Sequence, residues 1–387
     1  MSSQTRRELA ASCGALIVGG FDGHQAPREF LARIRSGGLG GVILFSRNIE
    51  DPPQVAELCR ELHAAAPADR PLWISVDQEG GRVQRLREPL ALWPAMARLG
   101  AINDETLTRR VGAAIGTDLR ALGIDIDFAP VLDVVDNAEN TVIADRAFGA
   151  DAATVARHGV ALARGLADAG VIACGKHFPG HGGPIGDSHL DLPCDLRSRT
   201  AFDAQDLIPF TAAIAAGVPL LMVAHVVYPD LDATSGARPM DGTMGQGLRQ
   251  GSTLSEEGSP ATFSEAICRG LLRERLGFEG VLVSDDLEMG AITRHGAVDE
   301  AALLALYAGI DLFLVCHRAD RQEATREGFI RAVEGDAIVA AALARSLARL
   351  DGLRARHAPP PHLSGADLAA AIDPARHAAL LARLVLA

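Results

Sequence analysis

Eight short apolar segments recur along the chain, and helical stretches separate them. Most are apolar at nearly every position, which is typical of strands covered on both faces, as in parallel sheets. The expected strands are 15–21, 41–45, 72–77, 124–131, 171–175, 220–224, 280–284 and 310–315. The expected helices are 27–35, 53–65, 105–122, 152–169, 203–216, 264–276, 299–308 and 321–353, the last interrupted.

This alternation predicts an α/β fold of the (β/α)₈ TIM-barrel type with long loops. A doubly wound open sheet is the alternative architecture. No G-x-G-x-x-G turn follows the first expected strand, so the nucleotide-binding signature of that fold is absent and the barrel is favoured.

Two segments depart from the alternation and define the domain organisation. Residues 234–259 are rich in Gly, Ser and Thr, which predicts a flexible insertion after the sixth strand. The triplet Pro359-Pro360-Pro361 ends the pattern. We therefore expect a single catalytic barrel over 1–356 and a C-terminal helical extension over 357–387.

Composition restricts the partners and the compartment. The net charge of −12 argues against nucleic acid and anionic membranes as partners. None of the 6 cysteines stands in a C-x-x-C motif, which indicates reduced thiols rather than disulfides or a zinc site. No segment approaches the roughly 18 apolar residues of a membrane span, and the N-terminus does not read as a signal peptide. The expected location is the cytoplasm.

Polar residues follow the apolar segments where each expected strand ends. In a parallel barrel these ends meet at one mouth, where active sites lie. The residues at this position are Asp77, Glu79, Arg82 and Arg85 after strand three, Asp133 after strand four, Lys176 and His177 after strand five, His225 after strand six, and Asp285 and Asp286 after strand seven. The pattern predicts one active site ringed with carboxylates, cations and imidazoles.

A Gly- and Pro-rich loop after strand five carries His181, Asp187 and His189. If Asp187-Ser188-His189 is extended, the side chains of Asp187 and His189 fall on the same side. A carboxylate beside a histidine fixes its tautomer and stabilises its protonated form, as a proton-transfer residue requires.

Several chemistries are conceivable for this ring. No serine stands in a G-x-S-x-G motif. His and Asp residues could bind a divalent metal, but no H-E-x-x-H motif is present and nearby Lys and Arg oppose a cation. A phosphate-binding barrel lacks its Gly-rich turn near strands seven and eight. The residues favour acid/base chemistry on a neutral, hydroxyl-rich substrate, such as glycoside hydrolysis, without metal or cofactor.

Five segments strengthen this interpretation: VDQEGGRVQRL (76–86), DRAFG (145–149), GKHFPGHG with DSH (175–182 and 187–189), AHVVYPDLD (224–232) and VSDDLEMGAI (283–292). In order and spacing they resemble family 3 glycoside hydrolases, and more closely the single-domain bacterial β-N-acetylhexosaminidases of peptidoglycan recycling. The resemblance covers about residues 12–355.

The resemblance implies a retaining, exo-acting hydrolase that releases terminal β-linked N-acetylglucosamine from muropeptide fragments. It assigns the nucleophile to Asp285 and the general acid/base to His189, with Asp187 as its partner. It assigns sugar binding to Asp77, Arg85, Arg146, Lys176 and His177, and supporting roles to Asp286, His181 and His225.

Two alternatives remain open: a β-N-acetylglucosaminide phosphorylase with the same dyad, and a catalytically silent sugar-binding barrel. The expected partner is a small carbohydrate, and the chain is expected to be a monomer or homodimer. His317, after strand eight, stands where a small polar residue is expected, so the far rim of the pocket departs from the family pattern.

Overall fold

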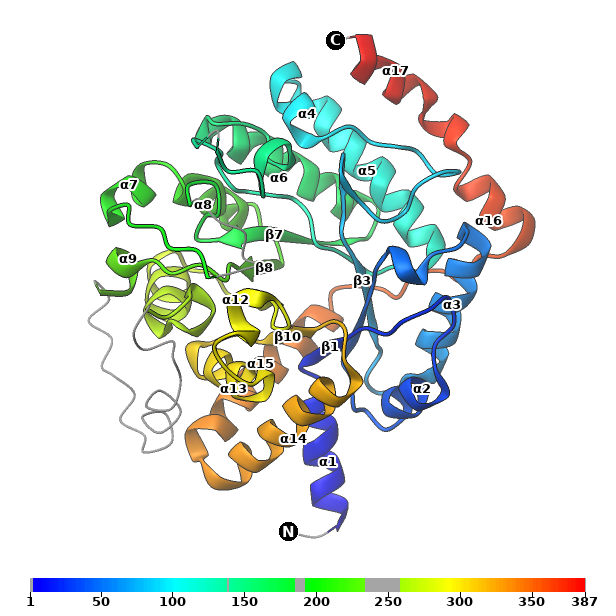
Figure 1. Ribbon diagram of the computed structural model, residues 1–387. Helices are drawn as coiled ribbons and strands as arrows, with labels where there is room; N and C mark the ends of the chain where they lie inside the picture. The colour runs from blue at the N-terminus through cyan, green and yellow to red at the C-terminus, as the bar shows by residue number, and fades with distance from the viewer. Residues whose placement is uncertain (1–2, 138, 185–191, 234–257, 387) are drawn as a thin grey trace.

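The computed structural model describes residues 3–137, 139–184, 192–233 and 258–386. Eight parallel strands form a closed barrel in the order β1-β10-β9-β8-β7-β6-β3-β2 (Figure 1). They are β1 (Ile17–Gly19), β2 (Gly41–Leu44), β3 (Trp73–Val76), β6 (Ile126–Asp127), β7 (Ile172–Phe178), β8 (Leu220–Val223), β9 (Val281–Asp286) and β10 (Leu312–Val315). The predicted (β/α)₈ barrel is confirmed.

Burial explains why the strands are nearly continuously apolar. Every residue of these eight strands is buried except Asp285 and Asp286 at the end of β9. Two strands run further than the sequence predicted. β7 continues through Lys176 and His177 to Phe178, and β9 continues to Asp286. The polar side chains at their ends are therefore held on barrel backbone rather than on loops.

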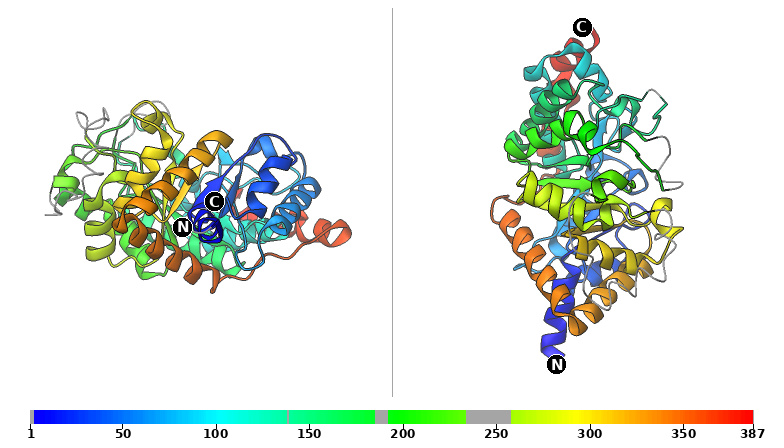
Figure 2. Two further views of the ribbon diagram at one scale, coloured as in Figure 1. Left: turned by 90° about the horizontal axis from the view of Figure 1, so that it is seen from below. Right: turned by 90° about the vertical axis from the view of Figure 1, so that its left-hand side faces the viewer.

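The helices surround the barrel and cover its outer face (Figures 1 and 2). Those near their expected positions are α2 (Arg28–Arg35), α3 (Pro52–Ala65), α5 (Glu105–Leu122), α6 (Ala152–Asp168), α7 (Arg199–Ala204), α8 (Leu207–Ala215), η4 (Ala266–Arg275), α13 (Val298–Ala308), α14 (Ala319–Gly335) and α15 (Ala337–Arg354). The side chains of Asp51, Asp104 and Asp151 accept backbone N–H groups at the starts of α3, α5 and α6, as N-caps do.

Two expected helices differ in detail. The helix expected over 264–276 is a π-helix over Ala266–Arg275; Ser264 caps its first turn by accepting the N–H of Ile267 at 3.1 Å. The helix expected over 203–216 is divided into α7 and α8. Asp206, between them, is buried and accepts two bonds from Arg197 instead of continuing one regular helix.

Some elements were not predicted. They include α1 (Ser3–Gly14), α4 (Met96–Ile102), α9 (Pro229–Ala233), α12 (Gly290–Thr293) and a hairpin of β4 (Gln78–Gly80) and β5 (Val83–Gln84). The hairpin turns at Gly80 and Gly81, whose φ angles are +94° and +58°, a region that favours glycine. It brings Arg85 back toward Asp77 at the mouth of the barrel.

The C-terminal segment carries α16 (Gly365–Ala371) and α17 (Ala378–Leu386), which lie along the outer surface beside α5 (Figures 1 and 2). A buried hydrogen bond ties it down, with His377 Nε2 3.1 Å from Asp118 Oδ1. Of the expected insertion over 234–259, residues 234–257 lie outside the described residues. Among the described helices, none combines the length and the apolar character that crossing a membrane requires.

Candidate active site

A cavity of about 430 Å³ opens at the carboxyl ends of the barrel strands. Its volume falls within the range of about 300–1,000 Å³ that small-molecule sites occupy. Its walls include Phe45, Asp77, Glu79, Arg85, Arg146, Lys176, His177, His181, Asp285, Asp286, Glu288, Met289 and His317. A larger cavity of about 670 Å³ lies at the opposite, amino end of the strands, where barrels of this type do not carry active sites.

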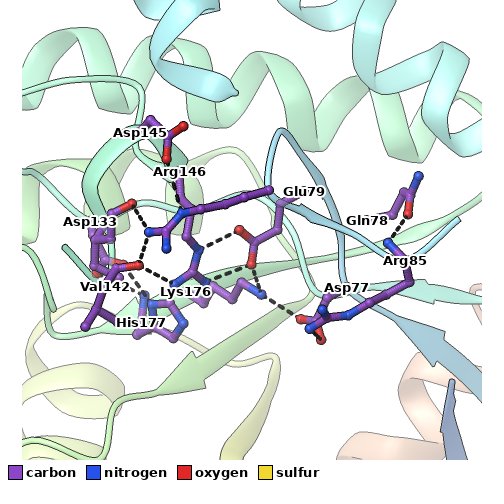
Figure 3. Close-up of polar contacts among 12 residues, drawn as sticks. Asp77, Gln78, Glu79, Arg85, Asp133, Val142, Asp145, Arg146, Lys176 and His177 are labelled. Carbon is purple, nitrogen blue, oxygen red and sulfur yellow. Dashed lines mark hydrogen bonds and ion pairs between the residues drawn. The ribbon is translucent and has the colours of Figure 1, made fainter. Parts of the chain in front are cut away.

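Lys176 lies in a buried charge network on one side of the cavity (Figure 3). Its Nζ lies 2.8 Å from Asp77 Oδ1 and 2.5 Å from Glu79 Oε1. Arg146 donates to both oxygens of Glu79 through Nε and Nη2, each at 2.8 Å. Burial alone would raise the pKa of Glu79, but Arg146 and Lys176 outweigh it and hold that pKa well below its usual range. Glu79, Arg146 and Lys176 are therefore charged at neutral pH.

Part of this network remains able to bind a ligand. An ammonium group has three N–H donors, and Asp77 and Glu79 take two of those of Lys176. The other oxygen of Asp77 lies 3.5 Å from Arg85 Nη2, a long contact that leaves it free to accept further hydrogen bonds. Donors and acceptors arranged side by side in this way suit the vicinal hydroxyl groups of a sugar.

Asp133 fixes the ring of His177. Its Oδ2 accepts from Nδ1 of His177 at 2.7 Å, and its Oδ1 accepts the backbone N–H groups of His177 and His181 at 3.1 and 2.7 Å. Because Nδ1 carries the proton, Nε2 is the nitrogen available to a ligand. His181 packs edge-on against His177, and burial together with His177 lowers the pKa of His181 to about 4, so it is neutral at physiological pH.

Asp285 lies at the end of β9 and lines the cavity. Its Oδ1 accepts the N–H of Asp286 at 2.7 Å. Burial would raise its pKa, but His225, His177, the Asp286 N–H and Lys176 together bring that pKa below its ordinary value. Asp285 is thus an ionised carboxylate in a largely buried site, which is the state a carboxylate nucleophile requires.

His225 lies behind the cavity wall, with both ring nitrogens bonded. Nδ1 lies 2.7 Å from Thr262 Oγ1, and Nε2 lies 3.2 Å from the carbonyl oxygen of Asp286. Burial lowers the pKa of His225 and so favours the neutral ring. A carbonyl only accepts, so Nε2 carries a proton and donates to Asp286.

The far rim combines the end of β2 with the loops after β9 and β10. Phe45 and His317 stack with ring centroids 5.5 Å apart, and His317 Nε2 lies 3.1 Å from Asp286 Oδ2. Glu288 accepts the backbone N–H groups of His317 and Arg318. The residue that departs from the expected pattern therefore lies in the cavity wall, next to the end of β9.

The structure gathers most of the residues predicted for the site. Asp77, Arg85, Arg146, Lys176, His177, His181, Asp285 and Asp286 line one cavity, and His225 lies behind it. Asp187 and His189 lie outside the described residues. Among the described residues, no three His, Cys, Asp or Glu side chains form a group suited to a metal ion.

Sequence reasoning placed Glu79 and Asp133 at strand ends but gave neither a role. Glu79 comes two residues after Asp77, so in an extended segment both side chains point the same way. That spacing could have identified it. Asp133 carries no such local signal, since its partners His177 and His181 are more than forty residues away in the chain.

Comparisons with known proteins point to one and the same family. Residues 14–353 match the glycosyl hydrolase family 3 N-terminal domain. A β-hexosaminidase of Thiobacillus denitrificans is 44% identical over 288 residues, 73% of this chain and 72% of that protein.

Solved structures agree. A family 3 β-N-acetylglucosaminidase from Paenibacillus superposes with a TM-score of 0.86 at 39% identity, covering 97% of this chain and 68% of that one. NagZ from Neisseria gonorrhoeae, in complex with N-trifluoroacetyl-D-glucosamine, has a TM-score of 0.73 at 34% identity, covering 96% and 97%. The chain belongs to glycosyl hydrolase family 3.

Proposed function

We propose that this chain is a retaining, exo-acting β-N-acetylhexosaminidase that releases terminal β-linked N-acetylglucosamine from muropeptide fragments of peptidoglycan. The observation that carries the proposal is the position of Asp285. An ionised carboxylate at the end of β9 shares one cavity with the donors and acceptors of Asp77, Arg146, Lys176 and His177. The names of the related β-hexosaminidases and N-acetylglucosaminidases support the amino sugar as substrate.

The proposed reaction has two displacements. Asp285 attacks the anomeric carbon as the bond from that carbon to the leaving oxygen breaks, and protonated His189 donates its proton to that oxygen. Water, deprotonated by the now neutral His189, then attacks the same carbon and breaks the bond to Asp285. Two inversions return the original β configuration. Asp187 holds His189 in the required tautomer; both assignments rest on the D-S-H motif and the family resemblance.

The buried network supplies the binding energy. Lys176 offers its third N–H donor, Asp77 offers the oxygen that Lys176 does not contact, and His177 offers its Nε2. All three residues line the cavity. A single ring carrying adjacent hydroxyls would engage them together. Because Asp77 and Glu79 compensate the charge of Lys176, the network binds a neutral sugar without leaving that buried cation unpaired.

A chromogenic β-N-acetylglucosaminide tests the proposal. We expect the wild-type enzyme to cleave it and the Asp285→Asn variant to lose about 10³-fold or more in kcat, because an amide is not a nucleophile. Unchanged turnover by Asp285→Asn would refute the assignment. Carrying out the reaction with and without phosphate distinguishes hydrolysis from phosphorolysis: we expect free N-acetylglucosamine in both cases.

A further inference from the structure

We propose that His317 is a positioning residue, which holds the backbone turn that presents Asp285 to the substrate. This inference rests on the proposed function, since it assumes that Asp285 is the nucleophile. It concerns the one rim residue that departs from the pattern expected at the end of the eighth barrel strand.

The first observation is the set of bonds to the Asp286 carboxylate. Its Oδ2 lies 3.1 Å from His317 Nε2. Its Oδ1 accepts the N–H of Glu288 at 3.0 Å and the N–H of Cys316 at 3.3 Å. The carboxylate thereby joins the turn after β9 to the end of β10. Of these three contacts, two come from backbone N–H groups and one comes from the side chain of His317. The contact from His317 becomes an ion pair when the imidazole is protonated.

The second observation is the direct link from Asp286 to Asp285. The N–H of Asp286 donates to Asp285 Oδ1 at 2.7 Å, and the carbonyl of Asp286 accepts from His225. A change in the Asp286 backbone therefore moves a hydrogen bond to the attacking carboxylate. Misplacement of a reacting group by about 1 Å can slow an enzyme about 10²-fold.

One face of the His317 ring is also held. It stacks on Phe45 at an interplanar angle of 26°, and the guanidinium of Arg47 lies 4.4 Å from the centre of the Phe45 ring. Arg47 also donates to the carbonyl of Cys316 at 2.8 Å. His317 thus bridges the end of β2 and the turn after β9, so its own position is fixed from both sides.

The surrounding charges determine how the contact depends on pH. The hydrogen bond to Asp286 raises the pKa of His317, with a further contribution from Glu288, against the opposing effects of burial and Arg47. Glu288 also pairs with Arg321, and Arg318 pairs with Asp320. A raised pKa means that the charged contact is complete below the ordinary value of 6.5 and weakens as pH rises through the value in the folded protein.

Two variants test the role. His317→Ala removes the contact, whereas His317→Gln can keep an N–H donor near the position of Nε2 but does not titrate. We expect His317→Ala to lower kcat about tenfold to a hundredfold with KM changed less than about threefold. His317→Gln should recover most of that loss. The ratio of kcat for His317→Gln to kcat for wild type should rise from pH 6 to pH 9, because only the wild type loses its charge.

The choice of substrate separates positioning from other roles. In a dinitrophenyl β-N-acetylglucosaminide the leaving group is dinitrophenolate, which departs without needing a proton. Cleavage of this substrate therefore bypasses the general acid. The loss in His317→Ala should persist on this substrate. A kcat within twofold of wild type, a loss confined to the less activated nitrophenyl substrate, or a pH-independent ratio for His317→Gln would overturn the inference. If the wild type cleaves neither substrate, the proposed function itself fails.

Discussion

Glu79 and Arg146 form a bidentate ion pair in the wall of the cavity, with both N–H···O distances at 2.8 Å and the Glu79 side chain 1% exposed. Lys176 shares the same carboxylate. One buried anion thus holds two cations that come from different strand-to-helix units, so this pair connects the two sides of the candidate site. From this arrangement we expect Glu79 to affect both stability and substrate binding.

The first prediction concerns Glu79→Gln. The variant leaves Arg146 and Lys176 with an uncompensated buried charge, so the free energy of unfolding should fall by about 3–5 kcal/mol. KM for the glucosaminide should rise, because Lys176 loses one of its two fixed partners. Urea unfolding and steady-state kinetics measure the two effects.

The matched control is Asp168→Asn, which breaks the exposed Arg109–Asp168 pair. Surface pairs contribute about 0–1 kcal/mol, so this variant should remain close to wild type. Equal losses in the two variants would show that the burial of Glu79 does not matter.

The second prediction concerns Asp133→Asn. The retained Oδ1 can still accept the N–H groups of His177 and His181, so the variant chiefly changes the bond to Nδ1 of His177. Loss of a hydrogen bond to a charged group is worth about 1.5–3 kcal/mol, which corresponds to about a tenfold to hundredfold fall in kcat/KM. Inhibition by free N-acetylglucosamine should weaken in parallel.

Asp133→Ala serves as the comparison for this variant. It removes the backbone bonds as well, so it should also lower the melting temperature, whereas Asp133→Asn should lower it much less. An Asp133→Asn enzyme with wild-type kcat/KM would mean that the His177 tautomer does not affect binding or turnover.

The sequence could predict the barrel because each strand is a local apolar segment that must be covered on both faces. It could not predict that β7 keeps Lys176 and His177 in the strand, since hydropathy marks polar residues as loop. The mouth of a barrel is where a strand can remain paired while its side chains face a cavity. The π-helix at Ala266–Arg275 also escaped prediction, because its hydrogen-bond spacing depends on packing rather than on composition.

The candidate site was predictable to the extent that it follows strand order. Residues at the carboxyl ends of parallel strands must meet, so Asp77, Lys176 and Asp285 could be grouped from the order of the strands alone. Pairings were not predictable. That His317 contacts Asp286 follows from the neighbouring positions of β10 and β9 in the closed barrel, and no local pattern in the sequence marks it.

The third prediction concerns acid stability. The pKa of His181 falls from 6.5 to about 4 in the folded protein, mainly through burial. The folded state therefore binds a proton less readily than the unfolded state. The contribution of His181 to the free energy of unfolding is complete above pH 6.5. It decreases by about 3 kcal/mol as pH falls toward 4.

Urea unfolding of wild type and His181→Gln at pH 7 and pH 4 measures this contribution. The difference between the two pH values should be smaller in His181→Gln by about the same 3 kcal/mol. Identical pH dependence in the two proteins would contradict a neutral, buried His181.

The last prediction concerns the turn of the hairpin that places Arg85. Gly81 has a φ of +58°, and a Cβ added there would lie 2.8 Å from the Cα atom of Ala95. Backbone cannot yield as a flexible side chain can, so Gly81→Ala must displace the hairpin and, with it, Arg85. KM should rise several-fold while kcat changes less, because Asp285 lies on a different strand.

Gly23→Ala is the control, since Gly23 also has a positive φ, +96°, but its added Cβ would meet no atom within 4 Å. That variant should lose only about 1–2 kcal/mol of stability and keep its KM. If both variants keep the wild-type KM, the hairpin does not position Arg85 for the substrate.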